Sequence, residues 1–278
     1  MFKGRSLLIA TKHEKEKVIA PILEKELGVK CFVIKELDTD LLGTFTGEVE
    51  RKNDPITTVR NKCLLAMELA NCDLAVASEG SFAVHPSIFF GSADDEFLIL
   101  IDKKNDLEII ARELSLETNF NGSEIKSEAE LIDFIQLVKF PTHGLIIRKN
   151  KDDFTDIVKG ITNHEDLTLT FRDFISKYGK AFIESDMRAM YNPMRMEVIK
   201  KATLKLTNKV TTACPNCATP GFGITGSNQG LPCELCNFPT RSTLSYVYSC
   251  QKCQYEKEEK YPNGKQKEDP MYCDICNS

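Results

Sequence analysis

The sequence has 278 residues, of which 42% are hydrophobic and 28% charged, and its formal net charge is −5. These values are ordinary for a folded protein and suit one large domain followed by a small one. The acidic balance argues against a general binder of polyanions, and no apolar run approaches the roughly 20 residues that cross a membrane. Because no secretory signal opens the sequence, we expect a cytoplasmic protein.

The first part of the chain alternates short apolar runs with amphipathic segments. We predict strands at 6–11, 31–34 and 74–77, and helices at 14–27 and 55–70. Asp54 is the expected N-cap of the second helix, with proline at the first helical position. The alternation predicts an α/β fold with a mixed, mostly parallel sheet and helices on both faces.

The next part of the chain changes this alternation. Segments 97–101 and 107–120 follow each other without an intervening helix, so we expect an antiparallel pair there. Further elements are predicted as helices at 128–139, 164–178 and 193–205 and as strands at 145–148 and 181–184. The expected domains are therefore an α/β domain over 1–210 and a cysteine-rich domain over 211–278.

Four C-x-x-C pairs occupy the last quarter of the sequence. The first two pairs are separated by 15 residues and the last two by 19, which is the spacing of zinc sites built from four thiolates. The proposed ligands are Cys214, Cys217, Cys233, Cys236, Cys250, Cys253, Cys273 and Cys276.

The two halves of this tail resemble each other, since Asn237 and Asn277 follow the second pair of each half. The repeat predicts two tandem zinc ribbons built from consecutive pairs, each with one structural zinc ion, although a crossed grouping stays open. A complete shell of four thiolates leaves no position for a reacting water. The tail has six Lys or Arg and seven Asp or Glu, so duplex DNA is not an expected partner.

Three polar clusters follow predicted strands, where open α/β sheets bind their ligands. A helix N-terminus with lysines favours phosphate, and carboxylates beside a phosphate favour Mg²⁺. Ion pairing with Arg188 or Arg195 would explain the later carboxylates equally well. The candidates are Glu79, Glu184 and Asp186 as catalytic carboxylates, and Lys12, His13, Lys15, Ser81 and Arg188 as contacts to a nucleotide or another phosphate-bearing small molecule.

Residues 59–70 (VRNKCLLAMELA) and 73–81 (DLAVASEGS) resemble inosine/xanthosine triphosphate pyrophosphatases. The resemblance implies Mg²⁺-dependent hydrolysis of a nucleoside triphosphate to the monophosphate and pyrophosphate. It also implies that Glu79 is a metal or catalytic carboxylate, with Glu48 or Glu50 as a second, and that Lys12 and His13 lie in a phosphate loop. In that loop His13 and Glu16 stand where the family has Asn and Lys.

The whole chain also resembles a family of uncharacterised bacterial proteins that join an N-terminal α/β domain to paired zinc ribbons. Residues 184–189 (ESDMRA) and 192–196 (NPMRM) carry this resemblance, which implies zinc binding. Two functions follow. The first is a metal-dependent nucleotide phosphohydrolase, which requires Glu79, Glu184 and Asp186 to converge on one ion. The second is a non-catalytic zinc-ribbon module that recognises a protein or single-stranded nucleic acid.

Overall fold

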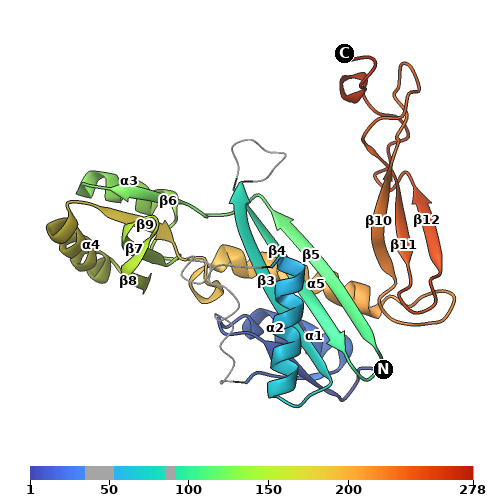
Figure 1. Ribbon diagram of the computed structural model, residues 1–278, viewed down its shortest axis with the longest axis horizontal. Coiled ribbons are helices and arrows are strands. Elements are labelled where there is room, and N and C mark those ends of the chain that lie inside the picture. The colour runs from blue at the N-terminus through green and yellow to red at the C-terminus, as the bar shows by residue number, and fades with distance from the viewer. Residues whose placement is uncertain (35–52, 85–91, 278) are drawn as a thin grey trace. The chain divides into compact units, whose positions relative to one another are not determined.

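The computed structural model describes residues 1–34, 53–84 and 92–277 and divides the chain into two compact units, Met1–Thr207 and Asn208–Ser278 (Figure 1). The first unit contains two β-sheets and the helices that pack on them. The second contains one small sheet and the cysteine-rich segments. Within the described ranges, no helix combines the length and the apolarity that a membrane crossing needs.

The first sheet of the first unit has five strands in the order β2-β1-β3-β4-β5. β1 (Ser6–Ala10) pairs in parallel with β2 (Lys30–Phe32) and β3 (Leu74–Val84), whereas β4 (Ser92–Asp102) and β5 (Leu107–Ser115) are antiparallel neighbours. The predicted α/β class with a mixed sheet is confirmed. Its parallel part is smaller than predicted, because parallel neighbours need a crossover connection and β3, β4 and β5 pair antiparallel.

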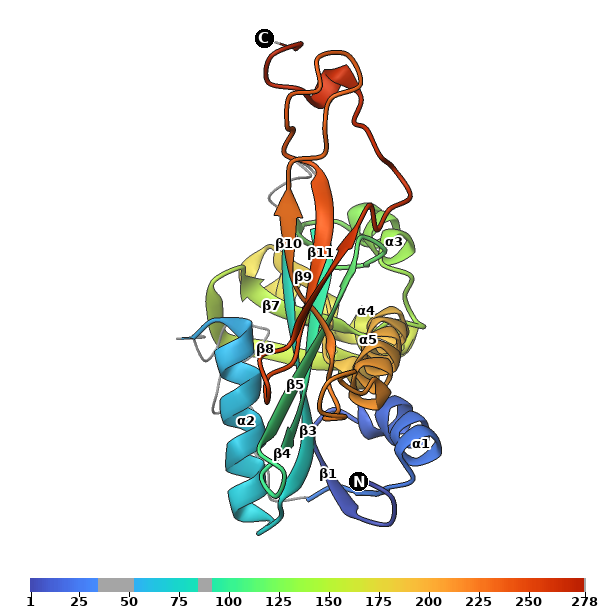
Figure 2. The same cartoon turned by 90° about the vertical axis from the view of Figure 1, so that its right-hand side faces the viewer.

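Helices cover both faces of this sheet (Figure 2). Asp54 caps α2 (Pro55–Leu69) as predicted, because its carboxylate accepts hydrogen bonds from the backbone N–H groups of Ile56 and Thr57. α2 packs its apolar side on alternate residues of β1, β3 and β4. α1 (Glu16–Leu27) and α5 (Pro193–Thr211) lie over the opposite face (Figure 2). Successive residues of each strand therefore face α2 and the layer of α1 and α5 in turn, and this also holds for the polar residues of the strands.

The second sheet of the first unit is antiparallel, with the strand order β6-β9-β7-β8. One of its faces forms an apolar core with two helices that includes Ile147, Phe171 and Ile183. The sequence did not predict β8, whose side chains are mostly half-buried and lack a clear alternation. The elements here are β6 (Gly122–Ile125), α3 (Glu128–Leu137), β7 (Leu145–Asn150), β8 (Asp153–Ile161), α4 (His164–Tyr178), β9 (Ala181–Ser185) and a 3₁₀ turn (Ala189–Tyr191).

The second unit is built on a three-stranded antiparallel sheet in the order β10-β11-β12. Its strands are β10 (Gly223–Gln229), β11 (Thr243–Ser249) and β12 (Glu256–Lys260), and a 3₁₀ turn follows at Pro270–Tyr272. Gly223 lies opposite Ser249 and Gln229 lies opposite Thr243. The segments that flank β10 and β11 therefore meet at the two ends of this hairpin.

Candidate functional sites

The eight tail cysteines form two clusters of four, and the sulfur atoms of each cluster all lie within 4.8 Å of one another. We call them the first and the second cysteine cluster. The structure has all of these cysteines as free thiols. The first cluster is Cys214, Cys217, Cys250 and Cys253, and the second is Cys233, Cys236, Cys273 and Cys276.

The sulfur–sulfur distances fit tetrahedral coordination of one ion. In the first cluster they are 3.7 Å between Cys214 and Cys253 and 3.6 Å between Cys217 and Cys250. In the second they are 3.9 Å for Cys233–Cys276 and 3.5 Å for Cys236–Cys273. A zinc ion with sulfur ligands at about 2.3 Å needs tetrahedron edges of about 3.8 Å. Each cluster could therefore hold a metal ion.

The predicted grouping of consecutive pairs is wrong, and the crossed alternative is the one that the structure adopts. The reason lies in the spacers. The 15 residues between the first two pairs contain β10, an extended strand that separates those pairs by about 3.3 Å per residue. β11 then returns antiparallel and brings the third pair back beside the first. The second and fourth pairs meet at the other end of the sheet.

All four cysteine pairs close their turns in the same way. The carbonyl oxygen of the first cysteine accepts a hydrogen bond from the backbone N–H that follows the second, as between Cys233 and Asn237 at 3.0 Å. Asn237 takes a left-handed conformation at φ 60°, and Ala218 and Gln254 do so as well, each at φ 58°. The left-handed conformation thus also follows the first cysteine pair of each half, where no asparagine is present. The asparagines therefore do not define a repeat unit.

The first cysteine cluster has additional support from polar and apolar groups. Asn216 donates its backbone N–H to Cys214 Sγ at 3.4 Å and its side-chain amide to Cys253 Sγ at 3.5 Å. Such donors favour the thiolate that binds metal. Phe222 is buried against the cluster and packs on Tyr248. This end of the second unit thus has a small core of its own.

The first unit contains a second candidate site, a buried charged cluster beside β3 and β4. Each of its six residues is at most 8% exposed. Charged side chains are almost never buried to this degree unless they are paired, and clusters of them are concentrated at functional sites. The members are Lys15, Lys62, Glu79, Asp94, Glu96 and Arg195.

Two ion pairs account for four of these six residues. Lys62 of α2 donates to the Glu79 carboxylate. Arg195 of α5 donates from Nε to Glu96 Oε1 at 2.5 Å and from Nη1 to the carbonyl oxygen of Met187. The Arg195–Glu96 pair lies against Gly80, where a Cβ atom would come closer than 3.0 Å to both side chains. Gly80 therefore leaves the space that the pair occupies.

Lys15 and Asp94 remain outside these ion pairs. Lys15 Nζ donates to Ser78 Oγ at 2.9 Å, and burial, assisted by the charge of Arg195, lowers its pKa to about 7. Burial, together with the charge of Glu96, raises the pKa of Asp94 to about 8. Among the described residues, neither Asp94 Oδ1 nor Glu96 Oε2 has a hydrogen-bond partner. Within the described ranges, the cluster thus combines a lysine without a carboxylate hydrogen-bond partner and two buried carboxylate oxygens without donors.

The structure brings only some of the predicted site residues together. Lys15 and Glu79 belong to the buried charged cluster. Ser81 lies two residues beyond Glu79 on β3 and is half-buried. In the predicted phosphate loop, Lys12 is exposed and the backbone N–H of His13 donates to Thr11 Oγ1.

The three predicted catalytic carboxylates each contact a different basic residue. Glu79 pairs with Lys62, Glu184 of β9 with Arg148 at 2.9 Å, and Asp186 with Arg188. Among the described residues, these carboxylates do not form a group that could hold one ion. Burial raises the pKa of Glu184 to about 7. Positions 48 and 50 lie outside the described residues.

Four members of the buried charged cluster, Lys62, Asp94, Glu96 and Arg195, were not predicted as site residues from the sequence. A signal for two of them was present, because Asp94 and Glu96 are two apart in a strand that continues with the apolar residues 97–101, so they share one face. Arg195 is positioned by Asn192, whose side-chain oxygen accepts the Arg195 backbone N–H at 3.0 Å. The sequence did not indicate that this stretch would contact β4.

These observations define a two-unit α/β protein that has a buried charged cluster in its first unit and two interleaved four-cysteine clusters in its second. Residues 62–278 match the family model described as Domain of unknown function (DUF6671), and the chain belongs to this family. The matched range contains both cysteine clusters and all of the buried charged cluster except Lys15. A comparison with curated proteins finds no match.

Proposed function

We propose that the protein is a phosphohydrolase that acts on a nucleoside triphosphate in its first unit and that carries two structural zinc ions in its second. The observation that carries the catalytic part is the buried charged cluster. Four of its residues form two ion pairs with each other. The other two, Lys15 and Asp94, have charges that complement a phosphate and a divalent cation, respectively.

The catalytic role of Lys15 follows from the cost of its burial. A buried ammonium group without a carboxylate partner destabilises the folded protein. A phosphate oxygen beside Lys15 Nζ would compensate that cost and raise the pKa of this lysine. The departing pyrophosphate of a nucleoside triphosphate carries such oxygen atoms, and a lysine that faces them would stabilise the charge that develops as it leaves.

A magnesium ion fits the chemistry of the neighbouring carboxylates. Asp94 and Glu96 would hold it, since Asp94 Oδ1 and Glu96 Oε2 have no donor among the described residues and Mg²⁺ prefers oxygen ligands. The ion would neutralise charge on the phosphate oxygens. This assignment replaces Glu184 and Asp186 by residues of β4 and retains Lys15 from the residues that the sequence indicated.

Two zinc ions would replace the hydrophobic core that a unit of this size cannot form. The sulfur–sulfur distances support zinc, and a complete shell of four thiolates supports a structural role. A reducing compartment would keep the cysteines available to the metal, which supports our expectation of a cytoplasmic protein.

Pyrophosphate release from a panel of nucleoside triphosphates, with and without Mg²⁺, tests the catalytic proposal. We expect turnover of at least one nucleotide, a requirement for the cation, and loss of about 100-fold or more in the Lys15→Met and Asp94→Asn variants. Lys17→Met is the matched control, because Lys17 is exposed and pairs with Glu14. No release from any nucleotide by the zinc-loaded wild-type protein would contradict the catalytic proposal and favour a non-catalytic binding module.

A further inference from the structure

The two cysteine clusters differ in what surrounds them. The first has Pro215-Asn216 and Gln251-Lys252 between its cysteines, with a polar residue before the second cysteine of each pair, and packs Phe222 into a small core. The second has Glu234-Leu235 and Asp274-Ile275 at the same positions. Leu235 is 72% exposed and Ile275 is 54% exposed. Both turns of the second cluster thus expose a hydrophobic residue to solvent, whereas the turns of the first cluster have Asn216 and Lys252 at the same positions.

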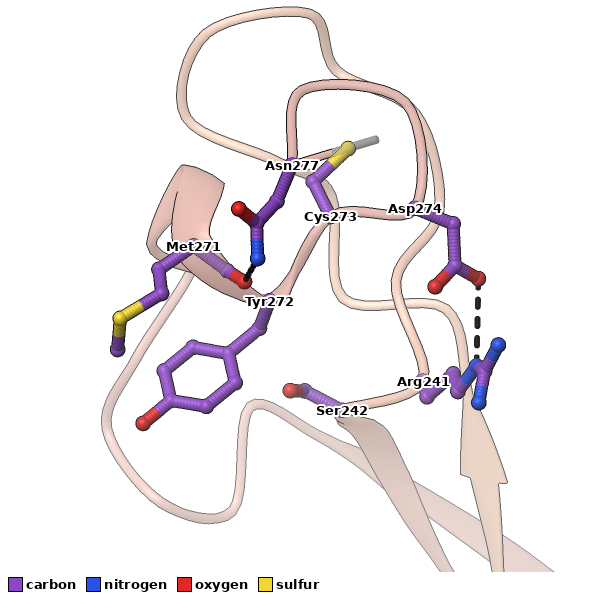
Figure 3. A pocket seen from close by; sticks show the side chains of 7 residues that line it. All are labelled: Arg241, Ser242, Met271, Tyr272, Cys273, Asp274 and Asn277. Carbon is purple, nitrogen blue, oxygen red and sulfur yellow. Dashed lines mark hydrogen bonds and ion pairs between the residues drawn. The ribbon is translucent and has the colours of Figure 1, made fainter.

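Further apolar side chains are exposed at the same end of the second unit. Phe238, Met271 and Tyr272 are all exposed and flank the second cluster in sequence. Met271 and Tyr272 line a pocket of about 400 Å³, together with Ser242, Cys273, Asn277 and the exposed Arg241–Asp274 ion pair (Figure 3). Grouped apolar exposure of this kind, bordered by polar residues, marks interaction sites on folded proteins.

The charge of this end indicates what it would bind. Segments 231–242 and 265–277 contain three basic and four acidic side chains. Arg241 pairs with Asp274 and Lys265 with Glu268, which leaves the charges of Glu234, Asp269 and Lys267. A zinc ion bound by four thiolates adds about −2. The end of the unit is therefore acidic, with a total of about −3 once the zinc is included.

We propose that the exposed apolar residues of the second cysteine cluster, Leu235, Phe238, Met271, Tyr272 and Ile275, form a docking surface for a protein segment that carries apolar side chains flanked by Lys or Arg. The apolar anchors would fill the pocket beside Met271 and Tyr272, and the basic residues would contact the acidic border. A second copy of this chain is disfavoured as the occupant, because it would bring two acidic ends together. Nucleic acid is disfavoured for the same reason.

This proposal is independent of catalysis in the first unit, but it uses the zinc ion of the second cluster as a source of charge. The zinc-loaded full chain is the appropriate sample. A random peptide library displayed on phage is selected against it, and the enriched peptides are synthesised for fluorescence anisotropy. We expect enrichment of peptides that combine aliphatic or aromatic residues with Lys or Arg, and binding that weakens as salt concentration rises.

Two variants separate this surface from other binding. Leu235→Ser with Ile275→Ser removes the apolar tips and leaves all eight cysteines, and we expect about tenfold or greater loss of peptide affinity. Pro215→Ser with Gln251→Ser changes exposed positions in the turns of the first cluster and should leave affinity unchanged. Zinc content is measured for both, so that a loss of metal is distinguished from a loss of the surface.

Three results would overturn the proposal. The first is a library that yields no peptide or only acidic ones. The second is peptide binding that is the same in the wild type and in the Leu235/Ile275 variant. The third is concentration-dependent self-association of the full chain that this variant abolishes, because the occupant would then be a second copy.

Discussion

Lys15→Met replaces the buried ammonium group by an apolar side chain of similar length. Burial lowers the Lys15 pKa from 10.5 to about 7, which corresponds to a destabilisation of up to about 5 kcal/mol at about 1.4 kcal/mol per pKa unit. The unfolded chain keeps its proton up to pH 10.5, whereas the folded chain loses it near pH 7. The unfolded state therefore binds more protons between these values, and the wild-type protein gains stability as the pH rises through this window.

The size of the effect follows from this linkage. The contribution of Lys15 is a destabilisation of about 4 kcal/mol near pH 7.5 and about 2 kcal/mol near pH 9. Methionine also removes the hydrogen bond to Ser78, which costs about 1–3 kcal/mol. We therefore expect Lys15→Met to raise the free energy of unfolding by about 2 kcal/mol above that of the wild type near pH 7.5. Near pH 9 this difference should be smaller by about 2 kcal/mol, so that the two proteins are about equally stable.

Urea denaturation at several pH values measures this difference. Far-UV circular dichroism follows mainly the first unit, which contains α1 to α4 and most of α5. A variant that is more stable but has lost pyrophosphate release would show that Lys15 is kept for function at the expense of stability. A variant that is less stable at every pH would refute the reasoning, because Lys15 would then be a paired structural residue.

Three further predictions address the cysteine clusters and the space beside β3. Cys217→Ser with Cys253→Ser should leave one zinc per chain by metal analysis, because both changes fall in the first cluster. Cys217→Ser with Cys236→Ser should leave none, because it damages both clusters. If consecutive pairs shared a zinc ion instead, the first double variant would retain none and the second would retain one. Gly80→Ala should lower the free energy of unfolding of the first unit by about 1–3 kcal/mol in the same urea titration, because the added Cβ atom would come closer than 3.0 Å to the Glu96 and Arg195 side chains. Removal of zinc by a chelator should unfold the second unit and leave the helical circular dichroism signal of the first unchanged; a parallel loss of that signal would contradict two independent units.

Periodicity and capping residues predicted most elements of the first unit. Helix α4 was expected at 164–178 and is observed at His164–Tyr178, and Asp54 caps α2 as predicted. Such features are local, because apolar residues at helical spacing and a side chain that accepts a backbone hydrogen bond act within a few residues. The antiparallel pairing of β4 and β5 was also expected, since no crossover helix separates them.

The grouping of the cysteines could not be predicted from their spacing. Four C-x-x-C pairs identify the eight candidate ligands, because two residues between cysteines let both sulfurs face one ion. The choice of partner pair depends on the direction of β11 relative to β10. That direction places Cys250 beside Cys214. β12 then runs antiparallel to β11 and leads the chain back toward the other end, where Cys273 lies near Cys233. Sequence repeats cannot report such long-range pairing.

The α/β class, most of the local elements and the eight cysteines of the tail could be predicted from the sequence, because each depends on residues that are neighbours in the chain. The tertiary structure alone decided which charges share a site. Lys15, Glu96 and Arg195 come from three distant segments, and the antiparallel pairing of β3 with β4 places Glu96 opposite Gly80. At that position Gly80 has no side chain, and this leaves room for the buried Arg195–Glu96 ion pair.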